Sequence, residues 1–498
     1  MVTLAFILAL ASVSLPVAGE KKPPEKKGLS LEEALSQADE KVKAGDLDGA
    51  AELLRKAAAM EGATGEPSLR LGRVFETRYE LDAAIDAYKA AGAKLSGPAK
   101  GEALGRLAVV QEMRGSTEAA ATAEAAAATD PAGAWPVVAL SRARAREGKG
   151  DEAAALAQKA AQTGAGAAAQ AALGYAQEAR GDLAAAEAAY RAGIAAGAMD
   201  VGASLGLARV LRKTGRAAEA EPLLAKVLET APGAVEAYKE SARVKMALNR
   251  PADAMGDAAT AAVMAEGDAE ALLLVQQVGI AKALASIAMG QGEIAVQDLT
   301  TLRDQNPNAA EVRVGLAKAL VARRQLDAAL AELQKAVELK PDLAEAHFQI
   351  GFVNHALKGN AAAALPAYEK AVAADPGSVE YRTNLGAVLS DLKQFDRAVA
   401  ELTKVVGTPG YARAEGWIYL GRAHVGAKRY KDAIPALEKA VALSPASADA
   451  EASLGWCYFG LKDAENFKKH AGRARSLGHK EPTLLQYLTR VEGGEPIK

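Results

Sequence analysis

One pattern returns about every 34 residues through most of this chain of 498 residues. In each copy a Leu-Gly pair or a close variant is followed by a polar stretch, and an Ala stands twelve residues after the Gly. An apolar residue comes four positions later, followed by a second Ala and often by a Pro. The clearest copy comprises Trp417, Leu420, Gly421, Tyr430, Ala433, Leu437, Ala440 and Pro445. Self-similarity at this period identifies a stacked array of repeats and excludes most globular enzyme folds.

The repeated residues predict a pair of packed helices in each copy. A Gly or Ala at the eighth position, and Ala at the twentieth and twenty-seventh, leave room where two helices approach closely, while larger apolar residues fill the remaining space. Gly45, Gly181 and Gly215 fall at the expected turn between the helices, where a positive φ suits glycine. The closing Pro cannot continue a helix, so it separates one copy from the next.

These residues resemble the tetratricopeptide repeat family, whose pattern is Trp-x2-Leu-Gly-x2-Tyr, then Ala-x3-Phe, Ala and Pro. The resemblance implies an all-α fold, a right-handed α-solenoid or superhelix of about 12–13 helix-turn-helix repeats with a C-terminal capping helix. Repeats are expected to begin near Leu31, Gly65, Lys100, Ala134, Ala167, Val201, Val235, Ala269, Ala310, Ala344, Val379, Ala414 and Ala448.

The expected organisation has six parts. They are a signal peptide at 1–19, a Lys- and Pro-rich linker at 20–30, an N-terminal array at 31–268, a degenerate and extended repeat at 269–309, a C-terminal array at 310–481, and a capping helix with a tail at 482–498. The repeat at 269–309 lacks the Leu-Gly pair, which leaves open a hinge between the two arrays. The repeat at Ala344 has one extra residue between its helices, and the last repeat has Phe467 where a small Ala is expected.

The N-terminus predicts export. Leu4 to Ala18 form an apolar run, and small residues precede a cleavage point after Gly19. The run is short for a transmembrane helix, so we expect no integral span in the mature chain; an uncleaved anchor is the alternative. Because no Cys lies near the cleavage point, the expected location is the periplasm or the envelope, and the protein is not expected to be a lipoprotein.

Composition and motifs argue against catalysis and nucleic-acid binding. The net charge of −2 disfavours bulk binding to nucleic acid. Gly202 to Gly206 match the G-x-S-x-G pattern around Ser204, but that pattern needs a strand–turn–helix junction, and here it lies in a predicted helix. The single Cys457 reads as a small buried residue, and His347 and His355 as partly exposed side chains rather than a metal pair. We therefore expect no enzyme activity, no cofactor and no metal.

The resemblance implies that positions two, five, nine, twelve and thirteen of each first helix line a concave partner-binding groove. At position nine it places the basic residues Arg73, Arg142, Arg209, Arg243, Lys318 and Arg422, and Arg212 adds to this basic ladder. At position two it places the acidic residues Glu66, Glu236, Glu311, Glu345, Glu380 and Glu415. One hypothesis is that the arginines capture an extended partner segment with acidic groups. The alternative is that the two ladders pair with each other and keep the face hydrated.

The same positions in the C-terminal third are rich in aromatic residues. They carry Phe348, Phe352, Trp456 and Phe459 in a chain that is only 4% aromatic. Exposed rings would anchor an apolar part of a partner. Tighter packing near the C-terminal cap is the alternative.

The favoured function is therefore a non-enzymatic scaffold of the periplasm or cell envelope that binds protein partners through its groove. By analogy with exported arrays of this kind, it would serve a machine for secretion, outer-membrane assembly, pilus formation or gliding motility. The alternative is a glycan- or peptidoglycan-binding adaptor for polysaccharide export or cell-wall metabolism, in which the aromatic residues would contact sugar rings.

Overall fold

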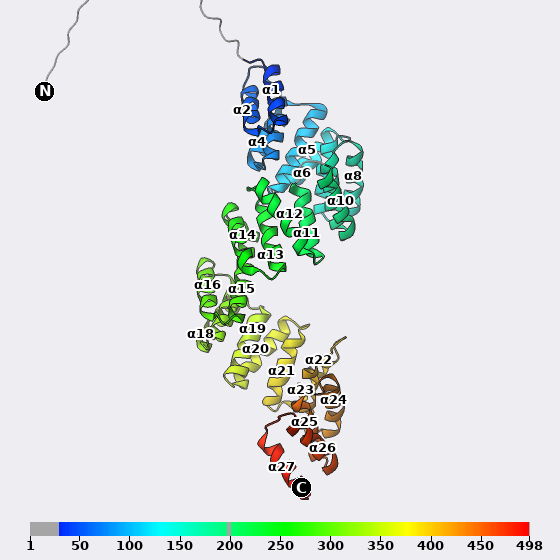
Figure 1. Cartoon of the computed structure of the whole chain (residues 1–498), viewed down its shortest axis with the longest axis vertical. Coiled ribbons are helices and arrows are strands. Elements are labelled where there is room, and N and C mark those ends of the chain that lie inside the picture. The colour runs from blue at the N-terminus through cyan, green and yellow to red at the C-terminus, as the bar shows by residue number, and fades with distance from the viewer. Residues whose placement is uncertain (1–28, 197–200, 498) are drawn as a thin grey trace, which may run out of the picture. The chain divides into compact units, whose positions relative to one another are not determined.

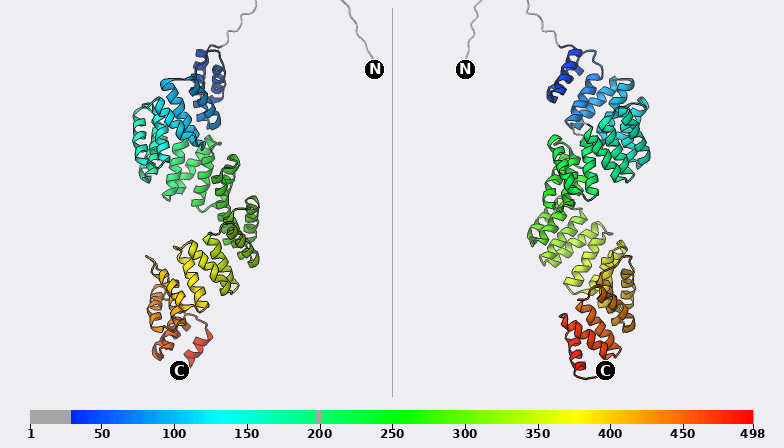
Figure 2. Two further views of the ribbon diagram at one scale, coloured as in Figure 1. Left: turned by 180° about the vertical axis from the view of Figure 1, so that it is seen from behind. Right: turned by 45° about the vertical axis from the view of Figure 1, so that its right-hand side comes forward.

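A computed structural model describes residues 29–196 and 201–497 of the chain (Figure 1). Within these residues it contains 27 α-helices, one short π-helix and no strand. The chain divides into two compact units, unit 1 (Met1–Glu240) and unit 2 (Ser241–Lys498). The division falls inside one helix, α13 (Val235–Ala247). Each unit is an α-solenoid of antiparallel helix pairs, as the repeat pattern predicts. Two further views show the same pairing (Figure 2).

The helices of unit 1 alternate between the first and second members of successive pairs. They are α1 (Leu31–Lys43), α2 (Leu47–Ala58), α3 (Glu66–Thr77), α4 (Leu81–Lys94), α5 (Gly97–Met113), α6 (Ala119–Thr129), α7 (Ala134–Arg146), α8 (Gly150–Gln162), α9 (Gly166–Ala179), α10 (Leu183–Ala195), α11 (Val201–Lys213) and α12 (Ala217–Thr230).

Unit 2 continues the same alternation and ends on a single helix. Its elements are α14 (Pro251–Met264), α15 (Ala269–Ala288), α16 (Gly292–Gln305), α17 (Ala310–Ala322), α18 (Leu326–Leu339), α19 (Ala344–Phe352), the π-helix η1 (Val353–Leu357), α20 (Ala361–Ala374), α21 (Val379–Asp391), α22 (Phe395–Val406), α23 (Ala414–Gly426), α24 (Tyr430–Leu443), α25 (Ala448–Gly460), α26 (Ala464–Ser476) and α27 (Pro482–Glu492).

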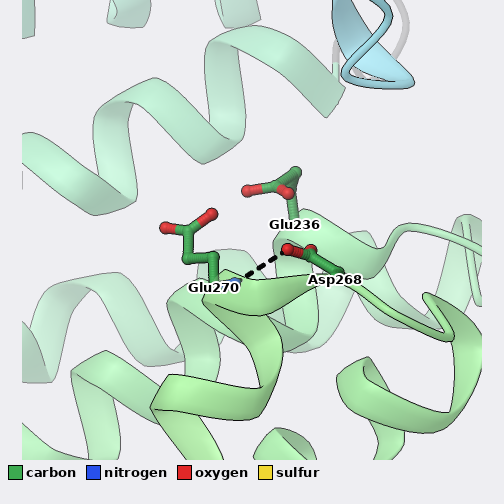
Figure 3. A group of neighbouring side chains, drawn as sticks. All are labelled: Glu236, Asp268 and Glu270. Carbon is green, nitrogen blue, oxygen red and sulfur yellow. Dashed lines mark hydrogen bonds between the residues drawn. The ribbon is translucent and has the colours of Figure 1, made fainter.

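Local signals explain where helices start and stop. Ser30 and Glu33 form a reciprocal capping box at the start of α1. Asp268 caps α15 by accepting a hydrogen bond of 2.9 Å from the backbone amide of Glu270 (Figure 3). Gly45 and Gly181 close the turns after first helices with φ of 77° and 78°, as predicted.

The eighth-position glycine is explained by one large side chain of the paired helix. A Cβ built on Gly174 would lie 2.4 Å from the Tyr190 ring, and one on Gly351 would lie 2.6 Å from the Tyr368 ring. Both tyrosines are fully buried. The small residue in the first helix and the large one in the second therefore interlock, which holds each pair together.

The extended repeat is longer because α15 begins early. Ala283 lies twelve residues before the buried Ala295, so Ala283 occupies the eighth position and the repeat proper starts at 276. The seven preceding residues, Ala269 to Val275, add about two helical turns to the same helix. Because seven residues nearly complete two turns, the buried stripe keeps its phase, and Leu274 packs with Ala254 and Ala258 of α14.

Among the described helices, α15 is long and apolar enough to cross a membrane by length and composition alone. It nevertheless packs against α14, α16 and α17, and core helices of soluble proteins pass the same test. It is therefore weak support for a membrane span.

Two other departures from the repeat also have structural explanations. The extra residue in the Ala344 repeat is absorbed by the π-helix η1, which widens the last turn of the first helix. Phe467 is fully buried and packs with Phe459 and with Leu484 and Leu488 of α27. The last repeat therefore uses a large residue where α27 covers its end.

Candidate partner-binding face

The sequence-predicted site residues lie on the first helices of the repeats. We call this surface the first-helix face and define it by positions two, five, nine, twelve and thirteen of each repeat. In unit 1 its arginines are used in ion pairs between neighbouring repeats. Arg73 Nη2 lies 2.6 Å from Glu102 Oε1, and Arg212 Nε lies 2.6 Å from Glu240 Oε1. The basic ladder of unit 1 is thus engaged by the chain's own carboxylates.

Tyrosine, glutamate and arginine form a recurring triad in this face. The Tyr190 hydroxyl donates to Glu178 Oε2 at 2.8 Å, and Arg209 Nε from the next repeat donates to Glu178 Oε1 at 3.0 Å. Burial acts to raise the pKa of Glu178, but the hydrogen bonds and charges of Arg209, Tyr190 and Lys213 together outweigh it, so the pKa is lowered. Tyr88, Glu76 and Arg106 repeat the arrangement three repeats earlier. Each of the two triads ties one repeat to the next.

Arg142 is the most buried member of the predicted ladder. Its side chain is 8% exposed and pairs with Glu112, which is equally buried. Its guanidinium also lies 4.3 Å from the ring centroid of Tyr175, and that of Arg209 lies 5.4 Å from the same ring. Tyr175 is therefore held by two arginines that sequence reasoning had assigned to a partner.

Tyr79 brings distant repeats of unit 1 together. It follows α3 with a φ of 58°, a conformation that is rare for tyrosine, and it is buried. Burial raises its pKa, and the nearby Tyr175 and Glu236 raise it further. Its carbonyl oxygen also lies 3.8 Å from the position that a Cβ on Gly233 would take. This part of the first-helix face is filled by the protein itself.

The first two charged residues of the ladder in unit 2 are also paired. Arg243 bonds Glu270, and Lys318 Nζ lies 2.9 Å from Glu345 Oε1. The Glu345 carboxylate also accepts a hydrogen bond of 2.8 Å from Tyr381. Arg422, in contrast, is exposed, and no ion pair involves it in the described part of the chain. Every predicted cation except Arg422 is thus paired within the chain, but only Lys318 pairs with a member of the predicted acidic ladder, Glu345. Capture of an acidic segment stays a prediction.

The predicted aromatic residues pack against other rings. Phe348 is 6% exposed and stacks on Tyr381 at 4.7 Å between centroids, with Phe352 at 6.4 Å. The Trp456 Nε1–H group donates a hydrogen bond of 3.1 Å to Glu481 Oε2. The ring centroids of Phe459 and of Tyr487 in α27 lie 4.6 Å apart. The packing alternative therefore describes Phe348, Trp456 and Phe459, while Phe352, Trp456 and Phe459 stay partly exposed.

Tyr419, at the sixth position of α23, is a partly buried side chain that sequence reasoning missed. The charges of Asp391 in α21, Glu415 in α23, Asp449 in α25 and Arg422 act on the pKa of its hydroxyl. Burial raises the pKa of Tyr419, and the three carboxylates raise it while Arg422 lowers it. The five positions taken from the family omit position six, so Tyr419 was not among the predicted site residues.

The motifs weighed for chemistry lie in structural positions. Ser204 is 4% exposed inside α11, away from any strand–turn–helix junction in the described residues. Cys457 is buried, which raises the pKa of its thiol to about 12. His347 contacts the carbonyl of Pro341 at 2.8 Å, whereas His355 contacts Asp391 at 2.8 Å. The two histidines therefore have separate partners.

Family models match both units of the chain. A model described as TPR repeat matches residues 317–358, and models described as tetratricopeptide repeat match 35–97, 205–271, 356–408 and 414–447. The chain belongs to the tetratricopeptide repeat family. Tetratricopeptide repeat proteins bind protein partners, and their repeats act as scaffolds for protein–protein interaction. No curated protein matches the chain.

Solved structures are similar to the chain at low sequence identity. YrrB, described as a TPR protein with an unusual peptide-binding site, is 23% identical over 38% of this chain and 97% of its own, with a TM-score of 0.35. The APC/C hetero-tetramer Cut9-Hcn1 is 14% identical over 93% of this chain and 96% of its own, with a TM-score of 0.39. PilW, described as a type IV pilus biogenesis factor, is 18% identical over 43% and 98%, with a TM-score of 0.38.

Proposed function

We propose that this tetratricopeptide repeat protein is a non-catalytic scaffold of the cell envelope that holds a protein partner on the first-helix face of unit 2. The observation that carries this proposal is Arg422, a member of the predicted basic ladder that is exposed and takes part in no ion pair within the described residues. In unit 1 the carboxylates of Glu112, Glu178 and Glu240 are 8%, 9% and 6% exposed and bonded to arginines. On the first helices of unit 2, the side chains of Asp391, Glu415 and Asp449 are 60%, 49% and 67% exposed. With Arg422 they leave charged groups of this face accessible to a partner.

Export is a separate part of the proposal. Its support is the apolar run from Leu4 to Ala18 and the small residues before Glu20, which lie outside the described residues. An exported scaffold would work within an envelope assembly such as a secretion, outer-membrane assembly, pilus or gliding machine. The glycan-binding alternative needs open aromatic faces, and the burial of Phe348 and the packing of Phe459 on α27 do not favour it.

The binding face can be tested by photo-crosslinking in living cells. A photoreactive amino acid replaces Arg422 or Asn384 on first helices, and Lys439 on the second helix α24 serves as the control. Lys439 is exposed and belongs to the same unit. Adducts with an envelope protein from positions 422 and 384, and none from 439, are expected. Adducts from 439 alone, or none from any position, would overturn the binding proposal.

Export is tested by cell fractionation and by mass spectrometry of the N-terminus. Recovery in the periplasmic or envelope fraction, with Glu20 as the first residue, is expected. Recovery of the chain with its N-terminal run in the cytoplasm would contradict export without bearing on the binding face.

A further inference from the structure

We propose that Tyr79 is a latch that holds the second repeat of unit 1 against the turn between α12 and α13, so that unit 1 has a closed form and an open form. In a solenoid each repeat contacts its neighbours, so a contact between repeats far apart along the array is an exception. The inference goes beyond the proposed function and does not rest on it. Three features of Tyr79 carry it: its backbone conformation, its burial outside the core of its own repeat, and its approach to Gly233.

Tyr79 takes a place in its turn that suits glycine. It stands at position fifteen of its repeat, directly after α3, with a φ of 58°. The turn is closed in the same way as the turn after α1, because the Glu80 amide donates to the Phe75 carbonyl at 2.9 Å and the Asp46 amide to the Lys41 carbonyl at 2.9 Å. This left-handed conformation is strained for a bulky residue. Glycine occupies the same position in four other repeats of unit 1, as Gly45, Gly148, Gly181 and Gly215.

The burial of Tyr79 distinguishes it from the other side chains at this position. Among the described residues, the repeats of unit 2 that have a non-glycine residue there also place it at positive φ, and each of these residues is exposed: Asn249, Arg324, Lys393, Lys428 and Lys462. Tyr79, by contrast, is 7% exposed. Backbone strain of this kind persists only where the surrounding structure holds the residue in place. The contacts that bury Tyr79 therefore compensate for the strain of its turn.

These contacts come from outside the core of its own repeat. That core includes Phe75, Ala84 and Tyr88, and Tyr79 is not part of it. The Tyr79 carbonyl oxygen instead lies 3.8 Å from the position that a Cβ on Gly233 would take. Gly233 belongs to the turn between α12 and α13, and both figures show the blue second repeat approaching the green start of α13 (Figures 1 and 2). Tyr79 therefore stands where two distant parts of unit 1 meet.

An ion pair on the first-helix face is consistent with this closure. Arg142 and Glu112, from two middle repeats of unit 1, are both 8% exposed. Lys318 and Glu345, which join neighbouring repeats of unit 2, are 32% and 35% exposed. Solenoids usually present this kind of surface to partners, so the lower exposure in unit 1 is what a closed turn predicts. Release of Tyr79 would give unit 1 a second, longer form.

The latch is tested by the distance between two spin labels in unit 1. Asp86→Cys in α4 and Lys226→Cys in α12 place the labels at exposed positions of second helices. The native Cys457 is buried, so it is protected from labelling. Double electron–electron resonance on the full chain then measures the distribution of distances. One short distance is expected when Tyr79 is present, with an open form of up to about 10%.

Tyr79→Gly separates the latch from the turn, because glycine keeps the left-handed turn after α3 and removes the ring. It should raise the open form to more than about half of the molecules, seen as longer and broader distances. Lys393→Gly is the matched control, since it replaces an exposed residue at the same position of a unit 2 repeat and should leave the distances unchanged. Unchanged distances in Tyr79→Gly would overturn the proposal.

A second variant tests whether the ring itself holds the closed form. Tyr79→Phe keeps the ring and should keep the short distance. Opening as large as that of Tyr79→Gly would show that the buried ring does not hold the two parts together, and would refute the latch. Circular dichroism of Tyr79→Gly should show unchanged helix content. Loss of helix would show that Tyr79 supports its own repeat, which also contradicts the proposal.

Discussion

At the scale of single residues, the repeats are held together by a small residue facing a large one. Gly351 lies against the buried ring of Tyr368, and Gly174 against that of Tyr190. A tyrosine ring is rigid, so it cannot make room for an added methyl group without moving the helix that carries it. The glycine is therefore required by packing and not by backbone conformation.

We predict that Gly351→Ala destabilises unit 2 by about 1–3 kcal/mol, because the new Cβ overlaps the Tyr368 ring and this outweighs the better helix propensity of alanine. Gly256→Ala is the matched control, since Gly256 lies on α14 of the same unit with nothing within 4 Å of an added Cβ. That control should leave stability unchanged or raise it by up to about 1 kcal/mol. Urea unfolding followed by circular dichroism measures both. An unchanged midpoint for Gly351→Ala would refute the interlocking explanation.

Glu112 makes the second prediction at this scale. It accepts from Arg142 and Arg146 in the interior of unit 1. Glu112→Gln should destabilise the fold by about 3 kcal/mol, because it removes the buried carboxylate charge that faces the Arg142 guanidinium. Glu52→Gln, which removes one partner of an exposed pair with Lys56, should have no measurable effect. Equal unfolding midpoints for the two variants would show that the buried pair contributes no more than a surface pair.

At the scale of elements, additions to the repeat are absorbed where they preserve helical phase. Seven extra residues lengthen α15 at its start, and one extra residue becomes the π-helix η1. At the C-terminal end, α27 covers the last pair and brings Leu484 and Leu488 onto Phe467. An array without such a cap would leave that apolar surface in water.

The cap gives a prediction of its own. Leu488→Ala should destabilise unit 2 by about 2–5 kcal/mol, because Leu488 is fully buried between α27 and the last repeat. Gln486→Ala on the exposed side of α27 is the control and should change little. Thermal unfolding by circular dichroism, with binding of a hydrophobic dye as a second measurement, distinguishes the two. If both variants unfold alike, α27 does not contribute to the core of unit 2.

At the scale of the whole molecule, carboxylates at the junctions between repeats recur in both units. The pKa is lowered for Glu102, Glu112 and Glu178 in unit 1 and for Glu345 and Glu401 in unit 2. Burial alone would raise these pKa values, but hydrogen bonds and charges from partners, mostly arginine and lysine, have the larger combined effect. A carboxylate whose folded pKa lies below its unfolded value stabilises the folded state when it is ionised. Cohesion between repeats therefore depends on pH.

We predict that stability is full above the ordinary glutamate pKa of 4.5 and falls progressively as the pH drops below it. The sign follows from the lowered folded pKa, since the unfolded chain takes up protons first. Urea midpoints measured by circular dichroism between pH 6 and about pH 3 check the trend. A midpoint that stays constant or rises on acidification would show that these junction carboxylates do not hold the repeats together.

The amino-acid sequence by itself determined the fold of this protein. The Leu-Gly pair, the two Ala residues and the Pro return at fixed positions in each repeat. They leave room for close helix packing and end the second helix, so the helix boundaries and the pairing follow from local residues. The three repeats that depart from the pattern were also visible in the sequence. The repeat at 269–309 has a lengthened spacing, the Ala344 repeat has an extra residue, and the last repeat has Phe467 in place of Ala. Turn glycines such as Gly45 and Gly181 were found where they were expected.

Only the tertiary structure decided how the charges of the first-helix face are used. The same pattern of arginine and glutamate fits partner binding or internal pairing, because the choice depends on distances between residues about thirty positions apart in the sequence, as between Arg209 and Glu178. Burial decided likewise that Phe348 packs inside the unit.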